Sequence, residues 1–278
     1  VLAEVSGNIL KNVKSVVVPN TDGRRGIDAA IAVGIVAGDA DAELQVIANV
    51  TEDDAAAIQG YLDATPIKVT CPVTPCLLDI FLHGKRAGHT AAVRVANNHT
   101  NIIYMERDGE VLLEKPLTAN AEDNLQDKSV LNVKDIITFA ETVPLDRIEP
   151  VIGRQIACNT AIAEEGLRNS WGANIGSTLL QRSDDIETQA RAWAAAGSDA
   201  RMNGCEMPVV ICSGSGNQGI TASVPVWRYG KLMGASEEKI LRAVCLSDLI
   251  TIHQKTGIGR LSAYCGAVSA GVGAGCGV

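Results

Sequence analysis

The chain is organised around SDARMNGCEMPVVICSGSGNQG, residues 198–219. This stretch predicts a polar turn carrying Asp199 and Arg201, followed by a strand-like apolar run at Met207–Cys212. A glycine-rich loop comes next, and a helical pattern follows over Ile220–Met233. An apolar run, a glycine-rich loop and a helix in this order are typical of a ligand-binding loop at a helix N-terminus.

Three glycines of this loop, Gly214, Gly216 and Gly219, fit the pattern G-x-G-x-x-G. Glycines allow a backbone to approach a ligand closely, and the N–H groups of a helix N-terminus attract anions. Two interpretations of the loop are therefore equally favoured: a site that binds an anion, and a glycine-rich turn whose only role is to let the helix pack close to its neighbour. A dinucleotide site is less favoured, because no second parallel strand follows the helix. The loop also has side-chain donors, on Ser213, Ser215, Asn217 and Gln218.

The composition is that of a globular chain of 278 residues, with 46% hydrophobic and 20% charged residues. Only 3% of the residues are aromatic, so we expect a core of close-packed helices with small side chains. The net charge of −8 argues against nucleic acid or an anionic membrane surface as a partner. Such helices are also compatible with a homo-oligomer.

The chain has eight cysteines, none of them in a C-x-x-C pair. In a chain of this size they are interpreted as reduced and mostly buried thiols of a cytoplasmic protein. No stretch is predicted to span a membrane, because glycine, alanine and serine dilute the uncharged segment Leu261–Val278. The sequence begins within a strand-like run, Val1–Val5, and ends within an apolar segment, so we expect a fragment truncated at both ends.

The fold class predicted from these patterns is α+β. A mixed α/β N-terminal part with a small sheet, residues 1–120, is expected to line the substrate, and an all-helical C-terminal part covers residues 130–278. The first part is predicted to contain helices at Gly7–Val13, Arg25–Ala37, Ala42–Asn49 and Asp53–Leu62, and strands at Ile67–Cys71, Leu77–Leu82, Thr90–Ala96, Asn101–Arg107 and Glu110–Lys115. Ser6 is expected to cap the first of these helices, and Asp108-Gly109 is predicted to form a hairpin turn. The second part is predicted to contain helices at Val133–Thr142, Asp146–Gly166, Trp171–Leu180, Ile186–Ala196, Ile220–Met233, Glu237–His253 and Gly259–Gly273. Ser236, followed by Glu238 and Lys239, is expected to start the helix at Glu237–His253.

Few side chains outside the loop suggest chemistry. Two histidines, His83 and His89, are interpreted as exposed residues at a strand turn. His253 is interpreted as an ordinary histidine near the end of a helix. His99 lies in a polar cluster, Asn97–Asn101, which is either a satisfied turn or a substrate cradle, the cradle being slightly favoured. Arg260 suits a carboxylate, and the nearby cysteine, Cys265, could be a nucleophile, a metal ligand or simply structural.

Several stretches together carry a family resemblance. They are Ser6–Asn12, His99–Ile102, Ser198–Met202, Ser213–Ala222 and Arg260–Cys265. On these stretches the chain resembles the L-cysteine desulfidase family, iron–sulfur lyases related to the α-subunit of iron–sulfur L-serine dehydratases. The run SGSGNQGITA at Ser213–Ala222 is the most specific of them.

The resemblance implies a 4Fe–4S cluster held by three cysteines, with one iron open to bind and activate the substrate. The first of these cysteines matches Cys265. The other two would lie beyond Val278 and the catalytic base, a cysteine, before Val1, so the fragment itself is predicted to be inactive and its catalytic residues are unknown.

The implied reaction is a β-elimination that releases sulfide or water from a small amino acid, after which the enamine hydrolyses to pyruvate and ammonia. The substrate carboxylate is expected at the Ser213–Gly219 loop, and Asn12 and Lys11 are weaker candidates. The substrate-binding candidates are Asn12, His99, Thr100, Asn101, Arg201, Ser213, Ser215, Asn217, Gln218 and Arg260.

The first interpretation is therefore a lyase acting on L-cysteine. L-Serine dehydration is the enzymatic alternative, because the same iron could activate a hydroxyl group. A non-catalytic protein that binds an amino acid or a nucleotide is the alternative from another class, and an NAD-binding enzyme comes last. The expected ligand is a small amino acid, and neither nucleic acid nor a membrane is expected as a partner.

Overall fold

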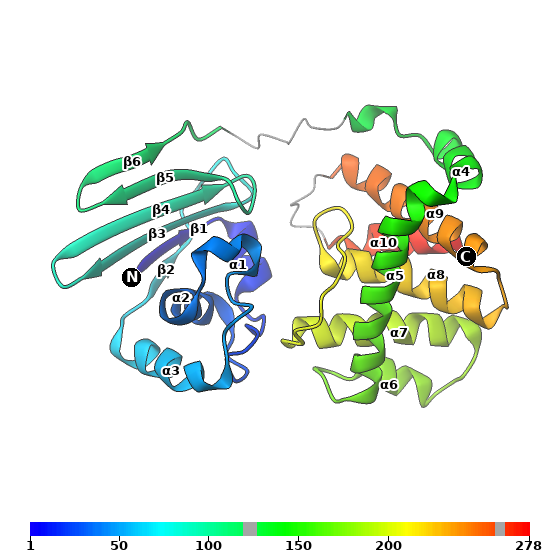
Figure 1. The fold of residues 1–278 in the computed structure, drawn as a ribbon, viewed down its shortest axis with the longest axis horizontal. Helices are drawn as coiled ribbons and strands as arrows, with labels where there is room; N and C mark the ends of the chain where they lie inside the picture. Colours follow the sequence, from blue (N-terminus) through cyan, green and yellow to red (C-terminus); the bar gives the residue numbers. More distant parts are fainter. Residues whose placement is uncertain (119–126, 259–264) are drawn as a thin grey trace. The chain divides into compact units, whose positions relative to one another are not determined.

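The computed structural model describes residues 1–118, 127–258 and 265–278. It divides into two compact units, Val1–Gln126 and Asp127–Val278 (Figure 1). The first unit is built on a six-stranded sheet, whereas the described part of the second is helical. The predicted α+β class is confirmed.

The sheet of the first unit has the strand order β2-β1-β3-β4-β5-β6. Its strands are β1 Leu2–Val5, β2 Lys68–Thr70, β3 Asp79–Arg86, β4 His89–Ala96, β5 Ile102–Arg107 and β6 Glu110–Glu114. β1 and β2 are parallel, and all other neighbours are antiparallel. The hairpin predicted at Asp108-Gly109 is confirmed, with φ of 52° and 83° at its two central residues.

The predicted strand at Leu77–Leu82 needs correction. β3 begins at Asp79 and continues to Arg86, so the turn to β4 is only Ala87-Gly88. His83 therefore lies within a strand, where its Nε2 is 3.1 Å from Oε2 of Glu4, and it is not a turn residue.

Three helices of the first unit, α1 Gly7–Val13, α2 Gly26–Ala37 and α3 Ala55–Ala64, lie on one side of the sheet (Figure 1). Ile27 and Ile31 of α2 pack in one apolar cluster with Ala3 and Val5 of β1. The predicted cap of α1 is confirmed, because the N–H of Ile9 donates to Oγ of Ser6. The helix predicted at Ala42–Asn49 is instead a 3-10 helix, η1 Ala40–Gln45.

A buried ion pair lies within the sheet. The guanidinium of Arg94 on β4 donates two hydrogen bonds to the carboxylate of Asp79 on β3, at 2.9 and 2.7 Å. Burial would raise the pKa of Asp79, but hydrogen bonds from Arg94 and Thr74 outweigh it and hold that pKa below its usual value. The pair thus joins the strands with both charges compensated.

The second unit opens with η3 Lys128–Val130 and continues as a helical array. Its helices are α4 Val133–Thr142, α5 Leu145–Arg168, α6 Ile175–Leu180, α7 Ile186–Met202, α8 Gly216–Leu232, α9 Glu237–Thr256 and α10 Ala267–Gly277. α5 crosses α7 and α8, and α10 packs on α8 and α9 (Figure 1). The predicted start of α9 is confirmed, because Ser236 caps it by accepting from the N–H of Lys239.

Small side chains let these helices pack closely, as the composition predicts. A Cβ added to Gly166 of α5 would come within 2.1 Å of the carbonyl oxygen of Ala196 on α7. The aromatic residues of this unit include Trp193 of α7 and Trp227 of α8, whose ring centroids are 5.5 Å apart.

Two predicted elements around Ser198–Gly219 are wrong. The polar turn expected at Asp199 and Arg201 is the last part of α7, which ends only before Asn203 and Gly204, where φ is 93°. Residues 207–211 belong to no strand, and Cys212 forms a single isolated bridge with Ser215. A strand needs a neighbouring strand for its backbone, and the described part of this unit contains none.

Three further helix starts differ from prediction. α6 begins at Ile175 and not at Trp171, because Asn174 adopts a left-handed conformation with φ of 54°. α10 begins at Ala267, and part of the helix predicted at Gly259–Gly273 lies outside the described residues. α8 begins at Gly216, one turn earlier than expected.

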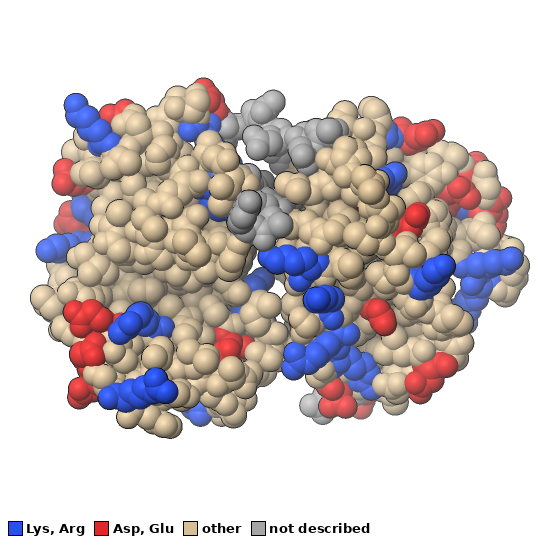
Figure 2. All heavy atoms as spheres, turned by 180° about the vertical axis from the view of Figure 1, so that it is seen from behind, with Lys and Arg blue, Asp and Glu red and all other residues tan. Residues whose placement is uncertain are grey.

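No helix in the described ranges combines the length and apolar character needed to cross a membrane. On the face shown in Figure 2, charged side chains are scattered among a larger area of uncharged atoms.

Replacing Arg94 with alanine is expected to lower the free energy of unfolding by about 3 kcal/mol, because Asp79 would remain as a buried carboxylate without its cation. Breaking a buried ion pair typically costs about 3–5 kcal/mol, and the lower end of this range applies because 26% of the Arg94 side chain is exposed. Urea unfolding at pH 7 measures the loss, and the exposed Arg86→Ala variant is the control, with a change within about 0.5 kcal/mol. Equal stabilities of the two variants would contradict the role of the pair. The lowered pKa of Asp79 places the stabilisation above pH about 4, and it should disappear as the pH falls further.

Candidate functional site

A two-residue turn places the start of α8. Ser213 and Gly214 have φ of 47° and 89°, and the backbone groups of Cys212 and Ser215 exchange two hydrogen bonds of 3.2 Å around them. Two successive left-handed residues make a tight chain reversal, for which glycine at the second position is well suited. The reversal leaves Ser215 extended, with φ of −141°, as the residue before the helix.

The other two glycines of the pattern permit close approaches. A Cβ at position 216 would come within 2.3 Å of Nε of Arg201. A Cβ at position 219 would come within 2.0 Å of the carbonyl oxygen of Val210. Gly216 thus leaves room for a guanidinium, and Gly219 leaves room for the chain that leads into the turn.

Arg201 brings a positive charge to the first turn of α8. It lies near the end of α7, and its Nη1 donates to Oδ1 of Asn217 at 3.1 Å. No carboxylate among the described residues lies within 4.0 Å of its guanidinium nitrogens. Burial lowers the pKa of Arg201. A partly buried guanidinium without a described counter-ion is a strong position for an anionic ligand.

The helix itself adds to this positive field. The side chain of Ser215 makes no capping hydrogen bond to α8, and the first turn contains no acidic residue. The helix runs for 17 residues from Gly216 to Leu232, so its N-terminus carries the partial positive charge of a long macrodipole. Backbone N–H groups, the helix dipole and Arg201 therefore favour the same kind of ligand, a carboxylate or another anion.

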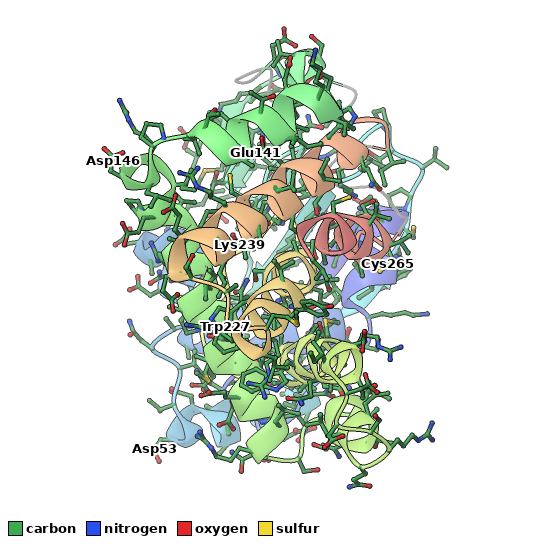
Figure 3. The ribbon with its side chains drawn as sticks, turned by 90° about the vertical axis from the view of Figure 1, so that its right-hand side faces the viewer. Asp53, Glu141, Asp146, Trp227, Lys239 and Cys265 are labelled. Carbon is green, nitrogen blue, oxygen red and sulfur yellow. The ribbon has the colours of Figure 1, made fainter. Side chains whose placement is uncertain are left out.

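Gln218 provides a further donor. Its side chain is only 2% exposed, and among the described residues its Nε2 has no hydrogen-bond partner. A Cβ added to Gly266 would come within 1.6 Å of its Oε1, so the amide lies against the residue that follows Cys265. Cys265 is exposed at the start of α10 (Figure 3). A buried amide N–H without an acceptor costs free energy unless a ligand accepts from it.

The structure brings together several predicted site residues in the second unit. Arg201 contacts Asn217, and the turn through Ser213, the residue Ser215 and the side chain of Gln218 belong to the same end of α8. Arg260 lies outside the described residues.

The predicted site residues of the first unit have other surroundings. His99 and Thr100 are exposed in the connection between β4 and β5, where Nδ2 of Asn101 donates to the carbonyl of Ala96 at 2.9 Å. Asn12 lies on α1, and its Nδ2 donates to Oδ1 of Asn8 at 3.3 Å. Their roles toward a substrate stay predictions.

Sequence reasoning missed a buried polar group behind the α8 turn. Gln155 and Asn159 of α5 and Asp248 of α9 are 2%, 0% and 9% exposed. The signal was available, because Gln155 and Asn159 continue the row of buried positions formed by Ile148 and Ile152 of the same helix. Amides at core positions call for specific hydrogen-bond partners.

The electrostatics of this buried group are unusual. Burial raises the pKa of Asp248 to about 6, although hydrogen bonds from Gln155 and Cys212 oppose the rise. Burial, together with the charge of Asp248, also raises the pKa of Cys212 and brings that of Cys245 to about 11. These thiols stay protonated near neutral pH, so they are poor nucleophiles and poor metal ligands.

The residues that the structure describes do not by themselves make a complete site for an iron–sulfur cluster. Within residues 1–118, 127–258 and 265–278, no group of three or more His, Cys, Asp or Glu side chains is placed to hold a metal ion. Cys265 is exposed and free, which fits a single thiolate ligand.

Comparison with known proteins gives a consistent result. The family model for the serine dehydratase alpha chain matches residues 41–278. A UPF0597 protein of Lachnoclostridium phytofermentans is 48% identical over 276 residues, which are 99% of this chain and 66% of that protein. UPF0597 proteins of Desulfitobacterium hafniense and Treponema denticola are each 46% identical, over 100% and 98% of this chain and 65% and 64% of their own lengths. The chain therefore spans about two thirds of the length of these relatives. No solved structure matches it.

Replacing Gly219 with alanine is expected to destabilise the protein by about 1–3 kcal/mol, because the added methyl group overlaps the carbonyl oxygen of Val210. Gly153→Ala in α5 is the matched control, since nothing lies within 4 Å of its added Cβ, and it should stabilise the helix by up to about 1 kcal/mol. Chemical denaturation measures both. A Gly219→Ala variant as stable as the wild type would show that the close approach is not required.

The raised pKa of Asp248 predicts a pH-dependent stability. The folded-state value, about 6, lies above the ordinary value of about 3.9, so the folded protein retains this proton to higher pH and loses stability as the pH rises through 6. Asp248→Asn carries no charge at any pH. Its stability relative to wild type should therefore increase by about 1–3 kcal/mol between pH 4 and pH 8, as measured by urea unfolding. Parallel pH curves for the two proteins would contradict the buried titration.

Proposed function

Because the chain belongs to the serine dehydratase alpha chain family, we propose that it is part of a lyase that eliminates the β-substituent of a small amino acid. The first candidate substrate is L-cysteine, which would yield sulfide, pyruvate and ammonia. The observation that carries this proposal is the position of Arg201. Its guanidinium lies against Gly216 at the N-terminus of α8 and forms no ion pair with a carboxylate among the described residues.

The α-carboxylate of an amino acid fits this position. A guanidinium can donate two parallel hydrogen bonds to a carboxylate, and Asn217 already orients Arg201 by accepting from its Nη1. The N–H groups at the start of α8 would complete the binding of the carboxylate. Nε2 of Gln218, which has no partner among the described residues, would then donate to a second polar group of the same ligand.

We propose a 4Fe–4S cluster as the cofactor, with Cys265 as one of its thiolate ligands. When bound, such a cluster would supply a Lewis acid for the leaving group. The roles proposed for this chain's own residues are to bind the substrate carboxylate and to orient the amino acid.

L-Serine is the second candidate substrate, favoured by the family to which the chain belongs. The carboxylate site would serve both amino acids equally, because they differ only in the β-substituent. Discrimination between them therefore depends on groups that contact that substituent.

The test is the release of sulfide and pyruvate by the full-length protein, purified and assayed without oxygen, with L-cysteine and L-serine in parallel. Arg201→Gln is expected to raise KM at least about tenfold for the amino acid that reacts, because it removes a charged hydrogen-bonding partner of the carboxylate. Arg201→Lys should recover only part of this loss, since an ammonium group cannot bind a carboxylate in the same bidentate way.

Arg154→Gln is the control, because Arg154 is exposed on α5 and should leave KM unchanged. An unchanged KM in Arg201→Gln, for either substrate, would remove Arg201 from the site. Turnover of neither amino acid by a protein that contains iron would refute the proposed substrates.

A further inference from the structure

We propose that Asn159 and Gln155 of α5 are positioning residues that hold the first turn of α8, and with it the anion site at Arg201, in its binding geometry. Neither residue was among the predicted site residues, and neither contacts Arg201 through any hydrogen bond of the described structure. The consequence for substrate binding rests on the function proposed above.

Asn159 acts as a backbone partner for Val210. Its Oδ1 accepts from the N–H of Val210 at 2.9 Å, and its Nδ2 donates to the carbonyl oxygen of the same residue at 3.1 Å. A neighbouring strand would normally provide such a pair of bonds. The side chain of Asn159 is 0% exposed, so these hydrogen bonds form away from water. They fix the position of the 207–211 segment along the axis of α5.

The fixed position of Val210 is passed on to α8. Its carbonyl oxygen occupies the space that a side chain at Gly219 would need. Gly219 in turn accepts through its own carbonyl oxygen from Oγ of Ser223, at 2.7 Å, and from Nε2 of Gln155, at 3.5 Å. Nδ2 of Asn159 also donates to Oγ of Ser223 at 3.1 Å. The first turn of α8 is thus held through its backbone by two side chains of α5 and by Ser223 of α8 itself.

Gln155 is itself oriented by a third helix. Its Nε2 donates to Oδ1 of Asp248 on α9 at 3.0 Å, and Gln155 is 2% exposed. Both hydrogen-bond acceptors of this amide nitrogen therefore belong to the protein, so Gln155 is occupied in joining α5, α8 and α9 and not in binding a ligand.

These amides contribute both stability and geometry. Apolar side chains at the two positions would leave the backbone groups of Val210 and the carboxylate of Asp248 without these partners. The amides also determine the register between the 207–211 segment and the first turn of α8, which contains Asn217. A site that binds a carboxylate with several donors depends on their relative positions to within about 0.5 Å.

A matched pair of variants tests the inference. Ser223→Ala removes a buried hydroxyl that donates at 2.7 Å to the carbonyl of Gly219, in the first turn of α8. Ser247→Ala removes a buried hydroxyl that donates at 2.7 Å to the carbonyl of Ala222, further along the same helix. The two changes are chemically alike and should lower the melting temperature to a similar extent, so they separate positioning from stability. Gln155→Met, which keeps the length of the side chain without its amide, is the direct variant.

The readouts are hydrogen exchange of the backbone amides at 216–222 and the dissociation constant for L-serine, measured by calorimetry. Gln155→Met and Ser223→Ala are expected to speed exchange in the first turn of α8 and to weaken L-serine binding at least about fivefold. Ser247→Ala is expected to change binding less than twofold. Equal effects of Ser223→Ala and Ser247→Ala on both readouts would overturn the inference.

The two proposals can fail separately. If the wild type binds L-serine and Arg201→Gln abolishes binding, but Gln155→Met and Ser223→Ala bind as the wild type does, the positioning inference is wrong and the function stands. If the wild type binds neither L-serine nor L-cysteine, the proposed function fails. The exchange of residues 216–222 in the same variants then decides whether the turn is held as described.

Discussion

The close approach of Gly219 to Val210 is the constraint on which the helical unit's site depends. Because position 219 has no Cβ, the carbonyl of Val210 can lie against the first turn of α8. That contact determines where the helix begins and therefore where its N–H groups point. It also places Asn217 within 3.1 Å of Arg201, which comes from another helix. Moving either backbone would separate the two groups that make the end of α8 attractive to an anion.

Local signals predicted the parts of this fold that are determined locally. The strands predicted at Thr90–Ala96 and Asn101–Arg107, the Asp108-Gly109 hairpin, and the caps at Ser6 and Ser236 each depend on residues a few positions apart, and each is confirmed. The end of α7 was misplaced for a related reason. Asp199 and Arg201 resemble a polar turn, yet they lie in the last turn of α7, and the left-handed residue just after the helix is Gly204, with φ of 93°.

What the sequence could not supply is the set of partners distant along the chain. Asn159 contacts Val210 across 51 residues, and Gln155 contacts Asp248 across 93. The pattern of α5 shows amides at core positions but not which backbone they meet. The strand predicted at Met207–Cys212 is wrong for the same reason. The apolar run favours an extended backbone, but its hydrogen-bonding partner is the side chain of Asn159 on α5 and not a neighbouring strand. The glycine pattern and the family resemblance indicated the loop, and only the structure showed that Arg201 lies against it.

The tryptophans allow the unfolding of the helical unit to be followed separately by fluorescence. The chain has three, Trp171, Trp193 and Trp227, and all belong to the unit that begins at Asp127. Trp193 of α7 and Trp227 of α8 pack against each other with their rings tilted by 48° and 5.5 Å between the ring centroids, and the guanidinium of Arg228 lies 4.6 Å from the ring centroid of Trp193. Emission excited at the red edge of the indole band therefore originates in the helical unit, whereas the sheet unit has no indole. A fluorescence-detected melt follows the helices that carry Arg201, and a circular dichroism melt follows both units, so the difference between the two curves isolates the sheet.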